Sequence, residues 1–421
     1  IMNRVIRVFE YEKLTLHKDD RERFLLSHEL KRLYDFNDRN GNEFFTGIRD
    51  GIKFKSYVGV IQIGGLTIEI LPKTDRNRAS DQDYSDWHGA LLNMLKVCKF
   101  ISVSTVSEAS LKRKYNSILD LYFEMYLDEI EKLLRQGLIK SYRKQSGNVT
   151  ALKGRIEFAK NIQKNLIHQE RFYTNHQVYD YDHMINQILF EGLKVLRLLS
   201  SNPTIVDRVS RITYAFPEVN TLKVDNTHFE RIKETRKTAS YTKAIQIARM
   251  ILLNYSPDIR QGQENMLTLL FDMNKLWEEY IYRMLVRSAD SDTHISFQNK
   301  QKFWETRTIR PDLVVTHKIG DQKETFVIDT KWKMLDTNNP KPSDDDLKQM
   351  YSYNLYWEAK RSMLLYPHSN SSSEKFGTFW KGRENSQDNQ CKVGFINVLN
   401  ERNQLDFAIG ERILKKIIEL N

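Results

Sequence analysis

Two acids and a lysine lie in neighbouring stretches of the sequence that both have the composition of β-strands. Asp312 lies in one run of apolar and β-branched residues, and Asp329 and Lys331 lie in the next. Such runs favour strands, and the polar segment with Gly320 and Asp321 between them favours a tight turn. We therefore predict an antiparallel hairpin that brings Asp312 close to the other two side chains.

The types of these residues indicate metal-dependent hydrolysis of a phosphodiester. Side chains alternate between the faces of a strand, so Asp329 and Lys331 should share one face. Two carboxylates and a main-chain carbonyl, here that of Thr330, are sufficient to anchor Mg²⁺, which prefers oxygen ligands and keeps several waters. Such a metal stabilises the charge that develops during attack by water, and Lys331 would orient that water or offset the charge. Mn²⁺ would bind the same oxygen ligands.

An acid followed two residues later by a lysine is a weak signal by itself. The chain is 29% charged, and other such triplets begin at Glu29, Asp321, Asp346 and Glu358. None of these four lies on an apolar strand with a Pro-Asp strand before it. A carboxylate and a lysine on a buried strand are costly unless they are paired or bind a ligand. The prediction therefore depends on the whole arrangement and not on the triplet.

Composition and charge describe a globular chain with a polyanionic partner. Hydrophobic residues make up 40% of the 421 residues, and the net charge of +10 favours binding to nucleic acid. No apolar run is long enough to span a bilayer and the N-terminus lacks a signal-peptide core, so we expect a cytoplasmic protein without a membrane contact. Cys98 and Cys391 are far apart, which predicts two buried apolar side chains and neither a disulfide nor a zinc site.

We expect an α+β multidomain fold with three domains in series. Residues 1–80 have several strand patterns and predict a β-rich N-terminal domain. Residues 81–260 repeat apolar residues three and four positions apart, which predicts a helical middle domain. Residues 261–421 alternate helical and strand patterns and predict an α/β domain with a mixed sheet flanked by helices. Within it, the polar stretch 368–390 is expected to be a mobile loop.

Basic residues are concentrated between Lys140 and Lys164, where Glu157 is the single acid. Such a run is either a solvated surface or a contact with the DNA backbone. Lys153 and Arg155 are the candidate backbone contacts, and the pattern leaves both interpretations open.

Four stretches, in order along the chain, carry a family likeness. They are YVGVIQIGGLTIEILPK (57–73), LKGRIEF (152–158), FDMNKLWEEYIYRML (271–285), and IRPDLVV with VIDTKWK followed by QMYSY (309–353). With these stretches the chain resembles the McrC family, the nuclease subunits of McrBC-type (type IV, modification-dependent) restriction systems. Residues 261–421 resemble the PD-(D/E)xK nuclease superfamily. The resemblance covers most of the chain and implies that fold for the C-terminal domain.

The resemblance implies roles for individual residues. Asp312 and Asp329 match the metal-binding acids of the superfamily, and Lys331 matches its catalytic lysine. In related nucleases a carboxylate on the helix before the strands completes the metal shell. Glu278 is our choice for that ligand, and Glu279 stays open as the alternative.

Gln349 and Tyr353 match a Gln and Tyr pair that lies near the scissile phosphate in related nucleases. They are four positions apart on a predicted helix and therefore share one face. The alternative is that they are a polar residue and an aromatic residue on a packed helix. We expect them to orient the substrate.

The family likeness implies a Mg²⁺-dependent DNA endonuclease subunit of a restriction or phage-defence complex. Its partner would be an McrB-like hexameric AAA+ GTPase, which reads methylated DNA and whose GTPase activity the N-terminal domain stimulates. The chain has no Gly-x-x-x-x-Gly-Lys-Ser/Thr loop, so we do not expect it to bind the nucleotide itself. Double-strand cutting requires two active sites, which implies a dimer of nuclease domains.

Two other functions are open at this point. The chain could be a non-catalytic DNA-binding and GTPase-activating adaptor that uses a nuclease-like fold as a scaffold. It could also be a free-standing nuclease that needs no motor.

Overall fold

The computed structural model describes residues 4–72, 81–98, 100, 118–256, 265–320, 322–333, 335, 341–367, 376–379 and 389–418. By packing, the chain forms two compact units. The smaller unit contains residues 62–65 and 119–269, and the larger unit joins 4–61, 66–118 and 270–421. The three domains predicted from the sequence divide the chain differently and stay a prediction.

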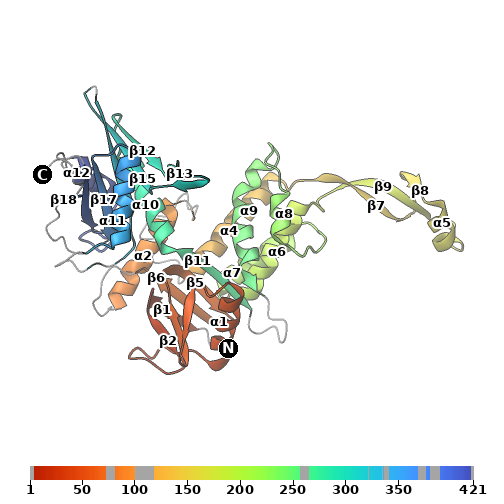
Figure 1. The fold of residues 1–421 in the computed structure, drawn as a ribbon. Coiled ribbons are helices and arrows are strands. Elements are labelled where there is room, and N and C mark those ends of the chain that lie inside the picture. Colours follow the sequence, from red (N-terminus) through yellow and green to blue (C-terminus); the bar gives the residue numbers. More distant parts are fainter. Residues whose placement is uncertain are drawn as a thin grey trace. The chain divides into compact units, whose positions relative to one another are not determined.

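A six-stranded mixed sheet forms the C-terminal part of the larger unit (Figure 1). In spatial order its strands are β12 (Thr293–Phe297), β15 (Leu313–Ile319), β16 (Gln322–Thr330), β17 (Arg361–Pro367), β19 (Gln390–Ile396) and β18 (Phe376–Thr378). The pairs β12–β15, β15–β16 and β18–β19 are antiparallel, and β16, β17 and β19 run parallel. The central strand β17 is apolar and almost wholly buried, as expected for a strand covered on both faces.

Helices cover both faces of this sheet. Helix α11 (Asp344–Tyr356) shares a core with Val327 of β16 through Met350 and Tyr353. On the other face, Trp332 packs against Trp277 of α10 (Met273–Ser288), with ring centroids 5.2 Å apart. This opposition follows from strand alternation, because Val327 and Trp332 are separated by an odd number of positions.

The last helix, α12 (Ile409–Ile418), packs closely against α10. A Cβ atom added at Gly410 would lie 2.2 Å from the carbonyl oxygen of Met284. The absence of a side chain at Gly410 therefore sets the distance between the two helices.

The N-terminal part of the larger unit contains several short strands. Strands β1 (Arg4–Phe9), β6 (Leu66–Leu71) and β5 (Tyr57–Ile63) are neighbours in one sheet, and β2 (Lys13–Thr15), β4 (Gly51–Phe54) and β3 (Phe45–Ile48) form a second. Helices α1 (Ser27–Arg39) and α2 (Asp81–Val97) belong to the same unit as these strands. A long-range hydrogen bond joins this part to the C-terminal sheet, because the indole N–H of Trp332 donates to the buried carboxylate of Glu10.

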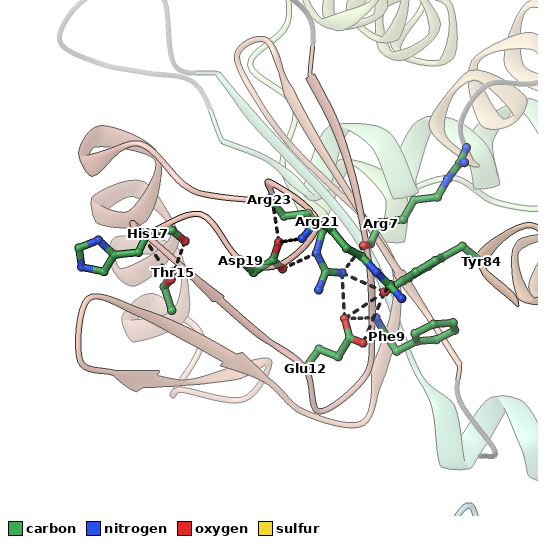
Figure 2. Close-up of polar contacts among 9 residues, drawn as sticks. All are labelled: Arg7, Phe9, Glu12, Thr15, His17, Asp19, Arg21, Arg23 and Tyr84. Carbon is green, nitrogen blue, oxygen red and sulfur yellow. Dashed lines mark hydrogen bonds and ion pairs between the residues drawn. The ribbon is translucent and has the colours of Figure 1, made fainter. Parts of the chain in front are cut away.

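A polar cluster joins the segment between β2 and α1 to helix α2 (Figure 2). The ring of Tyr84 stacks on Phe9, with centroids 4.4 Å apart, and its hydroxyl accepts a hydrogen bond from Arg23 at 3.0 Å. The guanidinium of Arg21 lies 4.8 Å from the centroid of the same ring, and Arg23 also donates to Glu12 at 3.0 Å. Burial and then the charge of Glu12 raise the pKa of Tyr84. These contacts hold the irregular segment in place.

Helices form the body of the smaller unit. They are α4 (Ile118–Gln136), α6 (Met184–Leu199), α7 (Pro203–Ala215), α8 (Asn226–Glu230) and α9 (Thr242–Leu253), with a 3₁₀ turn at Ala239–Tyr241. Gly192 of α6 lies against Tyr126 of α4, whose hydroxyl donates to the carbonyl of Leu189 at 2.7 Å. Strand β10 (Tyr255–Ser256) and the antiparallel start of β11 (Met266–Asp272) end this unit.

A long ribbon leads away from these helices within the smaller unit (Figure 1). Strands β7 (Ser141–Val149) and β9 (Phe172–Asp180) pair along their full length, and β8 (Arg155–Ile156) and α5 (Phe158–Asn165) lie at its tip. The prediction of a helical middle domain did not include these strands. Polar residues occupy both faces of these strands, and apart from Thr174 their residues are only half-buried or exposed. The strands therefore lack the alternation of apolar and polar residues by which a half-buried strand is recognised.

Several smaller predictions can be compared with the structure. Cys98 and Cys391 are buried free cysteines, as predicted. Most of the expected loop 368–390 lies outside the described residues, but its residues 376–378 form the edge strand β18. Among the described helices, none has the length and apolar character needed to cross a membrane.

Candidate active site

The predicted hairpin of β15 and β16 forms. Leu313 pairs with Ile328 in an antiparallel register, and Gly320 adopts the positive φ of 63° that the turn requires. Asp312 directly precedes β15, and Asp329 is the penultimate residue of β16. The two acids therefore meet at the same end of the hairpin, away from the turn.

Asp312 is held in place by Thr330. Its Oδ2 atom accepts a hydrogen bond from the main-chain N–H of Thr330 at 2.7 Å and another from the threonine hydroxyl at 3.0 Å. These bonds use one carboxylate oxygen of Asp312. The carbonyl of Thr330 is the predicted metal ligand. Because Thr330 also donates both hydrogen bonds to Asp312, the acid and the carbonyl are fixed relative to each other.

Lys331 connects β16 to helix α11. Its Nζ atom lies 2.7 Å from Oδ2 of Asp329, 3.5 Å from Oδ1 of Asp346 and 3.3 Å from Oε1 of Gln349. Although burial works against the charged form, the three nearby acids raise the pKa of Lys331, with Asp329 acting most strongly. The lysine is therefore a cation between two carboxylates, one on the strand and one on the helix.

Asp312 and Asp329 are difficult to ionise together. Asp329 is 2% exposed, and burial followed by the charge of Asp312 raises its pKa to about 7. The pKa of Asp312 is raised to about 6, first by burial and then by the charge of Glu278. Carboxylates with raised pKa values in a buried site are candidates for chemistry or for metal binding, because a cation would relieve both the burial and the repulsion.

Helix α10 directs Glu278, and not Glu279, toward this pair of acids. Oε2 of Glu278 accepts a hydrogen bond from the side-chain amide of Gln298 at 3.2 Å, and burial and then the charge of Asp329 raise its pKa. Glu279 instead forms an ion pair with Arg283 at 2.7 Å, one turn further along the helix. The choice of Glu278 as the candidate third carboxylate agrees with this geometry.

Gln349 and Tyr353 form a connected pair on α11. The side-chain amide of Gln349 donates to the Tyr353 hydroxyl at 2.7 Å, and that hydroxyl donates to the carbonyl of Arg310 at 2.9 Å. Burial and the charge of Asp329 raise the pKa of Tyr353, so its hydroxyl stays protonated and able to donate. Tyr353 thus holds the segment just before Asp312, and Gln349 lies between that tyrosine and Lys331.

Asp346 is a site residue that the sequence did not indicate. In the sequence it appeared as the first residue of another acid-x-Lys triplet. It lies in the first turn of α11, where Ser343 Oγ accepts a hydrogen bond from its main-chain N–H at 3.1 Å. In the structure its carboxylate lies 3.5 Å from Lys331 and 3.6 Å from Lys333. Burial opposes ionisation, but the Ser343 hydrogen bond and the two lysines lower the pKa of Asp346. Its three-residue spacing from Gln349 on one helix face was the available signal.

The candidate DNA-backbone residues Lys153 and Arg155 are not part of this group. Both are exposed and lie near the tip of the ribbon in the smaller unit, Arg155 on β8. Other members of the basic run have local partners, such as Lys160, which forms an ion pair with Glu157 at 2.7 Å. The two interpretations of the run stay open.

The donor set fits a hard divalent cation that keeps part of its water shell. In the described part of the chain, no three His, Cys, Asp or Glu side chains are already gathered closely enough to hold a metal. Asp312, Asp329 and the Thr330 carbonyl nevertheless supply the oxygen ligands that Mg²⁺ needs, with water in the other positions. Burial and the charge of a neighbouring carboxylate raise the pKa of both acids, and a bound cation would offset both effects.

The sequence and the fold were compared with those of known proteins. Residues 52–367 match the family described as "McrBC 5-methylcytosine restriction system component". The chain is similar to the type IV methyl-directed restriction enzyme EcoKMcrBC of Escherichia coli (strain K12), at 21% identity over 60% of this chain and 78% of that protein. A solved Thermococcus gammatolerans assembly of McrB AAA+ hexamers with bound McrC contains a chain of similar fold, with a TM-score of 0.71 and 17% identity over 98% of this chain and 100% of that one.

Proposed function

Because the chain belongs to the McrBC 5-methylcytosine restriction system component family, we propose that it is the metal-dependent DNA endonuclease subunit of an McrBC-like complex. The observation that carries this proposal is the convergence of Asp312, Asp329 and Lys331 at one end of the β15–β16 hairpin. A metal-dependent phosphodiesterase needs two anchoring acids and a nearby cation. The same end of the hairpin supplies all three.

Mg²⁺, or Mn²⁺, would be held by Asp312, Asp329 and the Thr330 carbonyl, with Glu278 as a further carboxylate. When bound, the ion supplies Lewis acidity and lowers the pKa of a coordinated water. Lys331 offsets the negative charge on the attacked phosphate. Asp346 and Gln349 hold the lysine when Asp329 is engaged, because both contact its ammonium group.

The partner we propose is an AAA+ GTPase hexamer of the McrB type. The support is the fold similarity to a chain of the McrB–McrC assembly, together with the absence of a phosphate-binding Gly-Lys-Ser/Thr loop from this sequence. In this proposal the motor reads methylated DNA in the cytoplasm and is stimulated by this chain. Because one site cuts one strand, a dimer of nuclease units performs double-strand cleavage.

Cleavage of a methylated plasmid tests the proposal. The protein is assayed with Mg²⁺, with and without its AAA+ partner and GTP, next to Asp329→Asn and the control Asp345→Asn. Asp345 is an exposed acid on the same helix as Asp346 and pairs with Lys348. Cleavage that needs the partner, GTP and Asp329 but not Asp345 is the expected result.

Two outcomes would favour the other functions. Stimulated GTP hydrolysis without Asp329-dependent cleavage would identify a non-catalytic adaptor. Cleavage by the chain alone, equally fast with and without the partner and GTP, would identify a free-standing nuclease.

A further inference from the structure

The hairpin of β13 (Gln301–Trp304) and β14 (Arg307–Ile309) forms a two-stranded sheet of its own in the larger unit. Residues 302–308 are all exposed, and among them Phe303 and Trp304 keep 50% and 59% of their surface exposed. A lone two-stranded hairpin is marginally stable in water. Neighbouring exposed aromatic rings on such an element are typical of a binding surface.

The base of this hairpin is bonded to the candidate active site. The side chain of Gln298 donates to Glu278 at 3.2 Å and accepts from Arg310 at 3.2 Å. The carbonyl of Arg310 in turn accepts the hydroxyl of Tyr353 at 2.9 Å. A four-residue strand extends about 13 Å at about 3.3 Å per residue. A ligand with its reacting group at the site is therefore within reach of the hairpin tip.

The charge of the hairpin complements a polyanion. Glu305 is the single acid between residues 299 and 310, against four basic residues: Lys300, Lys302, Arg307 and Arg310. The guanidinium of Arg307 lies 5.9 Å from the ring centroid of Trp304, so the tip presents a cation beside a flat apolar ring. Phe303 packs against Tyr356 of α11 with ring centroids 5.7 Å apart, which steadies the hairpin on the helix that carries Gln349.

We propose that the β13–β14 hairpin docks onto the duplex DNA that flanks the scissile phosphodiester. Lys302 and Arg307 contact backbone phosphates, and Trp304 enters the minor groove, which is about 6 Å wide and admits a flat ring. Apolar side chains that reach base steps in this groove are a recurring device of DNA-binding proteins. The proposal rests on the proposed nuclease function, because the duplex is placed by the phosphodiester at the active site.

Binding without cleavage tests the docking separately from the chemistry. The full chain with Asp329→Ala is titrated into a fluorescent duplex in EDTA over a range of salt concentrations. Replacing Lys302 and Arg307 together with Ala should reduce the slope of log K against log salt by about 1.8, or about 0.9 for each lost phosphate contact. Trp304→Ala should weaken binding about tenfold with the slope unchanged, and Trp304→Phe should retain most of the affinity.

The matched control removes two lysines from a different hairpin, β15–β16, which carries the candidate acids. The lysines lie at the turn, at the opposite end of that hairpin from the acids. Lys318 and Lys323 are exposed cross-strand partners next to the β15–β16 turn. Their double replacement with Ala should leave both the affinity and the salt slope of the parent unchanged.

Other outcomes overturn the docking proposal. They are an unchanged slope in the Lys302/Arg307 variant, equal losses in the Lys318/Lys323 control, binding to single strands alone, and no binding of the duplex by the parent. Plasmid cleavage is measured in parallel with the chain in which Asp329 is intact, and it tells the two proposals apart. Cleavage with hairpin-independent binding removes only the docking role, whereas hairpin-dependent binding without any cleavage removes the nuclease function.

Discussion

Replacing Asp329 with asparagine should change how the stability of the larger unit depends on pH when divalent metal is absent. The folded pKa of this carboxyl is about 7, because of burial and then the charge of Asp312, against about 3.9 in an unfolded chain. An acid with a raised folded pKa contributes stability that is complete below the unfolded pKa. That contribution is lost as the pH rises through the folded pKa. The parent should therefore lose stability between about pH 4 and pH 7.

The expected size follows from the same shift. Each pH unit between the two pKa values corresponds to about 1.4 kcal/mol. Between pH 5 and pH 8 the parent should therefore lose about 2–3 kcal/mol that Asp329→Asn does not lose. The ion pair with Lys331 needs no separate correction: it forms only where Asp329 is ionised, near pH 8, and the pKa of about 7 already includes the effect of the lysine.

Urea unfolding in EDTA at pH 5 and pH 8, followed by tryptophan fluorescence, measures this difference. All tryptophans of the sequence lie within the residue ranges of the larger unit, so the signal reports on that unit alone. The control is Asp345→Asn, whose side chain is 94% exposed and whose replacement should leave the pH dependence of the parent unchanged. A variant at Asp329 that follows the parent at both pH values would refute the reasoning.

Three further results are expected. Gly410→Ala should lower the free energy of unfolding by at least about 2 kcal/mol, measured in urea, because its Cβ would lie 2.2 Å from the carbonyl oxygen of Met284. Asp346→Asn should weaken Mn²⁺ binding about tenfold, or about 1.4 kcal/mol, because Lys331 loses its second carboxylate and holds Asp329 more firmly. Titration calorimetry measures this, and an unchanged affinity would contradict it. Mg²⁺ at a hundredfold excess over its Kd should stabilise the parent at pH 8 by about 2.7 kcal/mol and Asp329→Asn much less, as measured by urea unfolding.

The arrangement of Asp312, Asp329 and Lys331 could be predicted because it depends on local rules. A turn of two residues sets the register of a hairpin, and alternation places Asp329 and Lys331 on one face. The structure has both features. Their catalytic roles, the metal, DNA and the motor stay predictions.

Features that depend on distant packing could not be predicted. Asp346 meets Lys331 only because α11 folds back onto the sheet. The hydrogen bond from Trp332 to Glu10 joins residues that no sequence spacing relates. The ribbon of β7 and β9 was missed for a different reason, because its strands have polar residues on both faces and so no apolar alternation to recognise.

The larger unit is assembled from two parts of the chain that are separated by residues 119–269. During synthesis its first part leaves the ribosome well before β15 and β16 exist, and the segment between takes on the order of ten seconds to make at about 5–20 residues per second. Glu10 cannot meet Trp332 until translation has passed residue 332 of the 421 residues. A nascent chain that has not yet reached Asp329, near the end of β16, therefore lacks both this acid and Lys331, so the candidate site can form only late in synthesis.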